Sequence, residues 1–172
     1  RKIQSRMGLS ASAEYVDEFL KEISQIWKEG NKEYSYQGKK VDAVLVDEAQ
    51  FLSEAKIDTL SDLVDFYNIP VICYGLRTDF RNRLFPGSRR LMEIADVIEE
   101  VPTVCWCGKR AQCNTRYANG EIVREGAQIM LGSNESYVAL CRKHYKEGKL
   151  WKEAGAENET STRRNCKIME KE

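Results

Sequence analysis

Apolar residues recur at three- and four-residue intervals in three parts of the chain, which is the spacing of an amphipathic helix. The predicted helices are 12–30, 53–69 and 88–98. Ser12 and Gly30 are expected to begin and end the first helix. Pro70 ends the second, because the residue before a proline is disfavoured in a helix. Residues 1–11 lack this pattern and are predicted to form an exposed loop, and 31–40 a polar connection.

Two short apolar runs rich in β-branched residues, 41–47 and 71–76, are typical of buried strands. Strand, helix and strand follow one another directly, which indicates a parallel βαβ unit with a right-handed crossover. The first run ends in two adjacent carboxylates, Asp47 and Glu48. Ligands of open α/β sheets bind at the carboxyl ends of the strands. The two acids are therefore candidate functional residues, the alternative being a polar strand end or acids at a helix N-terminus.

Composition narrows the class of protein. The chain has 172 residues, 42% of them hydrophobic, which is enough for one core and a small appendage. Lysine plus arginine and aspartate plus glutamate both number 27, and this balance argues against a dedicated nucleic-acid binder. Six cysteines without a secretory signal favour metal binding or buried thiols in the cytoplasm over a disulfide framework. No apolar stretch is long enough to span a membrane.

The pattern changes near residue 101, where cysteine pairs and short strands replace the helical spacing. Asn119-Gly120, between two short apolar segments, is a strong signal for a type I′ β-hairpin. After residue 146 the chain is highly charged, which predicts a mobile tail or an extended helix. We therefore expect three parts: an α/β core over 1–101, a small second domain over 102–146 and a charged tail over 147–172.

Two ligand pairs flank the predicted hairpin. Three thiols and one imidazole suit a closed, tetrahedral and structural Zn²⁺ site, with the ligands Cys105, Cys107, Cys141 and His144. Cys113 is an alternative ligand. In the other interpretation the thiols are buried in a core and His144 is a surface residue. Cys73 and Cys166 are expected to be free thiols.

Several further motifs occur along the chain, at residues 5–10, 46–51, 75–81, 132–137 and 141–145, together with the cysteine pairs. Their order resembles that of the zinc-containing type II thymidine kinases, and they look closest to bacterial members. Each motif alone is weak, but the set is specific and extends over about residues 4 to 146. The chain thus resembles this family over most of its length.

The resemblance implies a P-loop-NTPase-like parallel sheet flanked by helices, with a small zinc-binding lid domain. It implies transfer of the γ-phosphoryl group of ATP to the 5′-hydroxyl of thymidine, giving dTMP. In the family pattern Glu48 matches the catalytic base, and Asp47 matches the acid that helps to place Mg²⁺, with Gln50 on the same Mg²⁺ and ATP side. Phe80 matches an aromatic residue that stacks on the thymine, and Tyr137 helps to hold the sugar.

The remaining substrate residues also follow from the resemblance. They are Phe51, Leu76 and Phe85, which line the pocket, and Gln128, Ile129, Met130, Leu131 and Gly132, whose backbone groups read the pyrimidine edge. Without the resemblance, Phe80, Phe85 and Tyr137 are better explained as structural aromatics. The family further implies a homotetramer and feedback inhibition by dTTP.

One family feature is missing from the sequence. No Gly-x-x-x-x-Gly-Lys-Ser/Thr phosphate loop occurs, and the chain does not begin with Met. Either the chain is a fragment or the protein has no phosphate loop, and we expect a fragment whose missing segment carries that loop and a central strand. A chain that truly lacks the loop should be inactive, because positioning and charge neutralisation supply most of phosphoryl-transfer catalysis. The rival hypotheses are a zinc-stabilised binding or assembly protein without catalysis, and a P-loop ATPase acting on nucleic acid.

Overall fold

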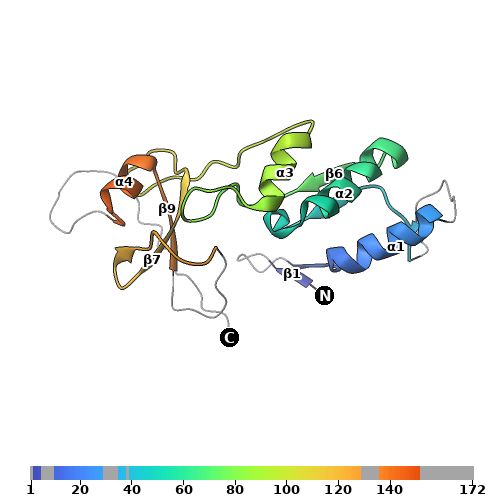
Figure 1. Ribbon diagram of the computed structural model, residues 1–172, viewed down its shortest axis with the longest axis horizontal. Coiled ribbons are helices and arrows are strands. Elements are labelled where there is room, and N and C mark those ends of the chain that lie inside the picture. The colour runs from blue at the N-terminus through green and yellow to red at the C-terminus, as the bar shows by residue number, and fades with distance from the viewer. Residues whose placement is uncertain (1, 5–9, 29–34, 38, 129–135, 152–172) are drawn as a thin grey trace. The chain divides into compact units, whose positions relative to one another are not determined.

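The computed structural model describes residues 2–4, 10–28, 35–37, 39–128 and 136–151 (Figure 1). The chain divides into two compact units, which are described separately below. Unit 1 comprises Arg1–Arg77 and Phe85–Asp96, and unit 2 comprises Thr78–Leu84 and Val97–Glu172. Both helices and strands occur in each part, so the protein belongs to the mixed α/β class.

The centre of unit 1 is a βαβ unit. Strands β5 (Val44–Val46) and β6 (Val71–Cys73) pair in parallel, with Val44 opposite Val71 and Val46 opposite Cys73. Helix α2 (Glu54–Tyr67) connects them, beginning after Ser53 and ending before Asn68. Asn68 adopts a left-handed conformation that closes the helix, a role asparagine fills well. The predicted strand–helix–strand order and the end of its helix are confirmed. The prediction of two buried strands over 41–47 and 71–76 is wrong in extent and in burial, because both strands are shorter and Leu45 and Ile72 are exposed.

Helix α1 (Val16–Lys28) and helix α3 (Pro86–Ile94) complete unit 1. Both predicted starts are wrong. Ser12 belongs to a strand, and α3 begins at Pro86 because proline is pre-organised for the first turn of a helix. The third helix also ends at Ile94 and does not reach Ile98.

Two short antiparallel pairs occur where the sequence predicted loops. Strands β1 (Lys2–Gln4) and β2 (Ser10–Ser12) pair with Lys2 opposite Ser12. Strands β3 (Ser35–Tyr36) and β4 (Lys39–Lys40) form the second pair. Such short strands are set by backbone pairing, which apolar periodicity does not report.

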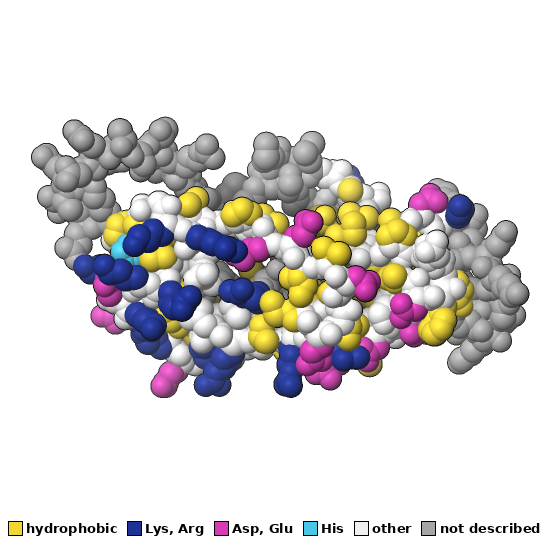
Figure 2. Space-filling view, turned by 90° about the horizontal axis from the view of Figure 1, so that it is seen from above, with side chains coloured by type: hydrophobic (Ala, Val, Ile, Leu, Met, Phe, Trp, Pro, Cys, Tyr) yellow, Lys and Arg dark blue, Asp and Glu magenta, His cyan; other side chains and the backbone are white. Residues whose placement is uncertain are grey.

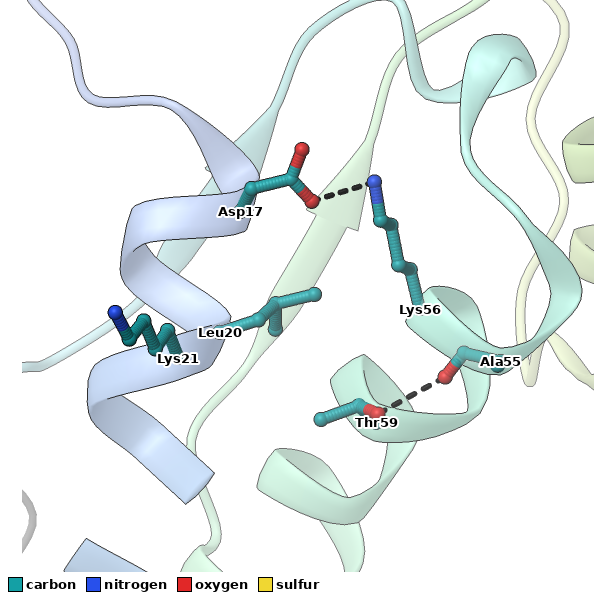
Figure 3. Close-up of a pocket in the computed structure, with 6 residues that line it drawn as sticks. All are labelled: Asp17, Leu20, Lys21, Ala55, Lys56 and Thr59. Atoms are coloured by element: carbon teal, nitrogen blue, oxygen red, sulfur yellow. Dashed lines mark hydrogen bonds and ion pairs between the residues drawn. The ribbon is translucent and has the colours of Figure 1, made fainter. Parts of the chain in front are cut away.

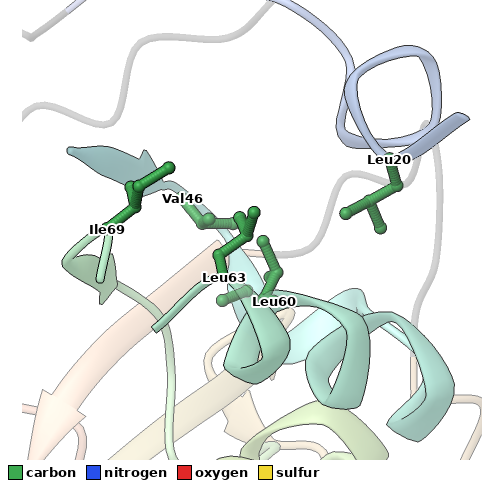
Figure 4. Packing of buried hydrophobic residues seen from close by; sticks show 6 residues of the cluster. Leu20, Val46, Leu60, Leu63 and Ile69 are labelled. Atoms are coloured by element: carbon green, nitrogen blue, oxygen red, sulfur yellow. The ribbon is translucent and has the colours of Figure 1, made fainter. Parts of the chain in front are cut away.

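The core of unit 1 joins its helices to its parallel strands. Figure 4 shows side chains of α1 and α2 gathered with Val46 of β5. The buried members are Leu20, Val46, Ala49, Leu60, Leu63 and Ile69. Burying each large side chain stabilises the fold by about 1.5–3 kcal/mol. This core holds the end of β5 in place.

Unit 2 contains an antiparallel sheet in the order β8-β7-β9. Its elements are β7 (Cys113–Ala118), β8 (Glu121–Ile122), β9 (Ser136–Leu140) and the short helix α4 (Arg142–Glu147). Asn119 and Gly120 link β7 to β8 and both have positive φ, 52° and 82°, as a type I′ turn requires. The predicted hairpin is confirmed.

A second apolar cluster forms the core of unit 2, and its members extend to Leu150 near the end of the described chain. Leu140 and Leu150 are buried in it, and Trp151 packs edge-on against Tyr117. Residues 152–172, which include Cys166 and most of the predicted tail, lie outside the described residues. Within the part of the chain that the structure describes, no helix has the length and apolar character needed to cross a membrane.

Candidate active site and metal centre

The two carboxylates predicted at the end of β5 are exposed to solvent. Glu48 adopts a left-handed backbone conformation, with φ 55° and ψ 34°. This conformation is uncommon for residues other than glycine and asparagine, and it occurs preferentially at functional sites. The Glu48 amide donates to Asp47 Oδ1 at 2.9 Å, which orients the neighbouring carboxylate. The end of the strand therefore turns sharply and presents both acids.

Gln50 connects Glu48 to the segment that follows β6. It lies in the 3₁₀ turn η1 (Ala49–Phe51) and is 1% exposed. Its Nε2 donates to Glu48 Oε2, and its Oε1 accepts from the Leu76 amide at 3.0 Å. A buried amide with both ends satisfied has little freedom to rotate. Gln50 thus restricts the position of the Glu48 carboxylate.

Helix α3 packs against the turn η1. Ser88 Oγ donates to the Leu76 carbonyl oxygen at 2.6 Å, so side chains hold both polar groups of the Leu76 backbone. Gly87 lies against η1, where an added Cβ atom would lie 2.5 Å from the Ala49 oxygen and 2.8 Å from the Gln50 oxygen. Only glycine allows the helix to approach the turn this closely.

The apolar residues predicted to line a pocket occur near the same turn in unit 1. Phe51 is half exposed and meets the buried Phe85 edge to face, with ring centroids 5.5 Å apart. Leu76 is exposed beside Gln50. The structure therefore brings Phe51 and Phe85 together, and it places Leu76 next to the Glu48–Gln50 pair.

In unit 2, three of the predicted substrate residues surround one arginine. Arg116 lies on β7 and is 0% exposed. Its Nε donates to the Tyr137 hydroxyl at 2.9 Å, and its guanidinium lies 3.9 Å from the centre of the Phe80 ring. A further donor, NH2, reaches the Gln128 carbonyl at 3.2 Å. Phe80 is itself buried, and its carbonyl accepts from the Tyr145 hydroxyl at 2.9 Å.

Asp79 organises the loop that carries Phe80. Its carboxylate is buried and accepts from the amides of Arg81 and Arg83, both at 2.9 Å, and from the Arg81 guanidinium. It also accepts from Gln128 Nε2 at 3.2 Å. Burial alone raises the pKa of Asp79, but the hydrogen bonds from Arg83, Arg81 and Gln128 outweigh it and leave the pKa below its ordinary value.

The four predicted metal ligands converge in unit 2. The ligand atoms of Cys105, Cys107, Cys141 and His144 all lie within 4.8 Å of one another. The Cys107 and Cys141 sulfur atoms are 4.0 Å apart, and Cys105 Sγ is 3.4 Å from His144 Nδ1. Tetrahedral Zn²⁺ with ordinary bond lengths places two sulfurs about 3.8 Å apart and a sulfur and a nitrogen about 3.5 Å apart. The donor set and its spacing therefore fit zinc, and such a closed set is structural.

The surroundings of these ligands are also ordered. The Trp106 ring stacks on His144, with centroids 4.0 Å apart and planes 6° from parallel. The backbone amide of His144 lowers the pKa of the Cys141 thiol, whereas burial raises that of Cys105. Cys113, the alternative ligand, is buried on β7 and is not part of the group. Cys73 is a free thiol on β6, and burial raises its pKa, as expected for an unreactive core cysteine.

Some predicted residues are not located by these contacts. Ile129, Met130, Leu131 and Gly132 lie outside the described residues. The hollow in Figure 3 has a volume of about 290 Å³ and lies between α1 and α2 of unit 1. It is shallow, and its lining of Asp17, Leu20, Lys21, Ala55, Lys56 and Thr59 contains none of the predicted site residues. We therefore assign it no function.

The sequence interpretation missed Arg116 and Asp79. Arginine is almost always exposed, so nothing in a single sequence indicates that one is fully buried. Asp79 lies in a polar segment with Arg77, Arg81 and Arg83, and nothing in the sequence indicates that its carboxylate is buried. Exposed lysines and arginines are in fact common in unit 2, and Figure 2 shows many of them on the face that it displays. Arg116 differs from them only in its tertiary position.

Comparisons with known proteins agree on one family. The family model described as thymidine kinase matches residues 1–145. The chain is 47% identical over 148 residues to the thymidine kinase of Haemophilus influenzae strain Rd, covering 85% of this chain and 73% of that protein. It is 46% identical over 150 residues to that of Pasteurella multocida, with the same coverage. The thymidine kinase of Legionella pneumophila strain Lens is 49% identical over 151 residues, covering 87% of this chain and 70% of the relative.

Proposed function

This chain belongs to the thymidine kinase family, and from that premise we propose that it transfers the γ-phosphoryl group of ATP to the 5′-hydroxyl of thymidine. The observation that carries the chemistry is Glu48. Its carboxylate follows the end of β5, its backbone is left-handed, and Gln50 restricts its position. A carboxylate held in this way can accept the proton of a hydroxyl as the oxygen attacks phosphorus.

We propose that Asp47 lies on the Mg²⁺ and ATP side of the same strand end. Its Oδ1 accepts the Glu48 amide, so the carboxylate is oriented by the turn that exposes it. Mg²⁺ prefers oxygen ligands and is usually held by one or two carboxylates together with substrate phosphates. Bound there with ATP, the ion supplies neutralisation of the charge that develops on the transferred phosphoryl group.

We propose further that β5 and β6 belong to a larger parallel sheet of the P-loop NTPase type. Leu45, Ile72 and Tyr74, on or next to these strands, are exposed in the described structure. Parallel sheets are normally covered on both faces and have near-continuous apolar strands. The exposed apolar side chains support the proposal that further elements cover and extend this pair.

We propose the thymidine-binding residues from the family resemblance. In unit 1 these are Phe51, Leu76 and Phe85, and in unit 2 they are Phe80, Gln128 and Tyr137, together with residues 129–132. The support in unit 2 is that Phe80, Gln128 and Tyr137 all contact Arg116. We propose that zinc held by Cys105, Cys107, Cys141 and His144 stabilises unit 2 and takes no part in the chemistry.

The family resemblance carries the remaining proposals. We propose that the protein acts as a homotetramer in the cytoplasm and that dTTP inhibits it as end product. Each is open to direct measurement: sedimentation velocity gives the oligomeric state, and turnover at increasing dTTP gives the inhibition. A monomer, or turnover insensitive to dTTP, would contradict the corresponding proposal without affecting the assigned reaction.

The central test is a nucleoside phosphorylation assay on the complete protein with ATP and Mg²⁺. We expect turnover of thymidine that exceeds turnover of deoxycytidine and deoxyadenosine by several orders of magnitude. A site that hydrogen-bonds one base pattern rejects analogues that leave its polar groups unpaired by roughly 10⁴–10⁵-fold. If thymidine were bound but never phosphorylated, the protein would be a binding module on a kinase scaffold.

A further inference from the structure

Arg116 has the largest fully buried side chain in the described structure. A buried guanidinium is unfavourable unless its donors are hydrogen-bonded. Three of its nitrogens donate to protein oxygens: Nε to Tyr137, NH1 to Ala127 at 3.0 Å and NH2 to Gln128. The planar guanidinium thereby connects Tyr137 of β9 to Ala127 and Gln128.

The face of the guanidinium has a partner as well. It lies 3.9 Å from the centre of the Phe80 ring and 5.6 Å from that of Tyr137. Arginine is suited to such a site because its charge is spread over a plane that can stack on one ring while its edges donate hydrogen bonds. A lysine ammonium has the charge but neither the plane nor the fork.

Asp79 also holds Gln128, one of the residues that Arg116 contacts. Gln128 is held twice, since its carbonyl accepts from Arg116 and its side chain donates to Asp79 at 3.2 Å. Phe80, adjacent to Asp79 in the chain, is held by Arg116 through its ring and by Tyr145 through its carbonyl. All of these residues belong to unit 2.

We propose that Arg116 is a positioning residue for the pyrimidine deoxynucleoside, acting through Phe80, Gln128 and Tyr137. This inference rests on the proposed function, which assigns those three residues to thymidine. Arg116 sets the angle of the Phe80 ring, the position of the Tyr137 hydroxyl and the direction of the Gln128 carbonyl. It does not touch the phosphoryl group, so it acts on nucleoside binding and not on ATP.

The test compares two identical substitutions in the complete enzyme. Arg116→Lys keeps the charge but removes the fork and the stacking plane. Arg124→Lys is the matched control, because Arg124 also donates to two carbonyls, of Tyr145 and Lys146, and lies 5.0 Å from the Tyr145 ring. Arg124 contacts none of the proposed thymidine residues in the described structure. Melting temperature and zinc content report whether each variant is folded.

We expect Arg116→Lys to raise the KM for thymidine about ten-fold or more, since small misplacements of binding groups cost up to about 100-fold. Its kcat should change less than about three-fold and its KM for ATP should not change, whereas Arg124→Lys should match the wild type in all three. A folded Arg116→Lys variant with unchanged KM for thymidine overturns the inference. Equal losses in kcat and in both KM values also overturn it, because they indicate a general structural role.

A second variant covers the case in which Arg116→Lys is not recovered folded. Tyr137→Phe removes only the hydroxyl that accepts from Arg116. An unchanged KM for thymidine in this variant overturns the inference. Where both variants fold, their effects should be non-additive, because they remove one shared contact. A wild-type enzyme that does not phosphorylate thymidine refutes the proposed function instead, and the two failures are thereby distinguished.

Discussion

Glu48 combines two features that a purely structural strand end does not need. Its backbone is left-handed, at a cost of about 1–3 kcal/mol for a residue other than glycine. Its carboxylate accepts a hydrogen bond from a buried amide, Gln50, whose other end is held by the Leu76 backbone. A simple polar strand terminus has no requirement for either. These contacts favour the interpretation of Glu48 as the catalytic base.

Glu48→Gln tests this role. We expect kcat to fall by about 10²–10⁴-fold, the usual contribution of a positioned general base. Thymidine affinity should stay close to that of the wild type, because the substitution keeps size and hydrogen-bonding capacity. Steady-state turnover and calorimetric titration of thymidine, both on the complete protein, measure the two effects. An unchanged kcat would remove Glu48 from its role.

Asp79 links the stability of unit 2 to pH. Its pKa is lower in the folded protein than in the unfolded chain, so its contribution to stability is present above an unfolded pKa of about 3.9 and is lost as the pH falls through the folded value. Asp79→Asn should lower the melting temperature of unit 2 at pH 7. The difference between variant and wild type should shrink as the pH falls below about 4. A difference that stays constant across this range would show that the carboxylate charge contributes nothing.

At the scale of elements, the contact between α3 and η1 positions the turn that carries the proposed catalytic residue. The helix begins at Pro86, and Gly87 then meets the carbonyl oxygens of η1 at a distance that no Cβ atom tolerates. Ser88, one residue further, holds the Leu76 carbonyl. The first turn of α3 therefore supports the residue pair that orients Glu48.

Gly87→Ala tests this contact. The added methyl group would meet backbone oxygens that cannot rotate away, so we expect a loss of about 1–3 kcal/mol in the free energy of unfolding, as overpacked sites show. We also expect a lower kcat, because η1 must move. Arg89→Ala in the same helix is the control. It removes an exposed ion pair with Glu93, worth about 0.3–0.5 kcal/mol. Urea unfolding of the two variants gives the comparison, and equal losses would contradict the close contact.

At the scale of the whole molecule, the two units are stabilised in different ways. Unit 1 has a core of leucine, isoleucine and valine side chains, whereas the small apolar cluster of unit 2 contains two of the predicted metal ligands, Cys105 and Cys141. A domain with so small a core commonly needs a metal to stay folded. Zinc is therefore expected to contribute most of its stabilisation to unit 2.

Chelation tests this division. Removal of zinc should increase hydrogen exchange in residues 101–145 before it affects β5, α2 and β6 of unit 1. Trp106 offers an independent reading, because its ring stacks on the ligand His144 and its fluorescence should change as the metal leaves. Mass spectrometry of exchanged peptides follows both regions in one experiment. Simultaneous loosening of the two units would contradict the division.

Much of the local structure was predictable because local signals specify it. Short apolar runs rich in β-branched residues indicated β5 and β6, and Asn119-Gly120 indicated its hairpin, since few residues other than these adopt positive φ without strain. The starts of the helices were less predictable. Ser12 has the chemistry of a cap but pairs with Lys2 instead, because backbone pairing outweighed the capping preference. Ligand spacing predicted the zinc site, whereas burial of Arg116 left no trace in the sequence.

By itself, the sequence indicated the family, the βαβ unit, four candidate metal ligands with Cys113 as an alternative, and the acids at the end of β5, because each depends on residue types and their order along the chain. Only the tertiary structure decided that the Leu76 amide holds Gln50 beside Glu48, that Gly87 lets α3 pack against η1, and that Arg116 joins Phe80 to Tyr137. These contacts connect residues far apart in the chain. Tertiary packing and the pairing of buried polar groups select such partners. The periodicity of apolar residues along the chain does not report them.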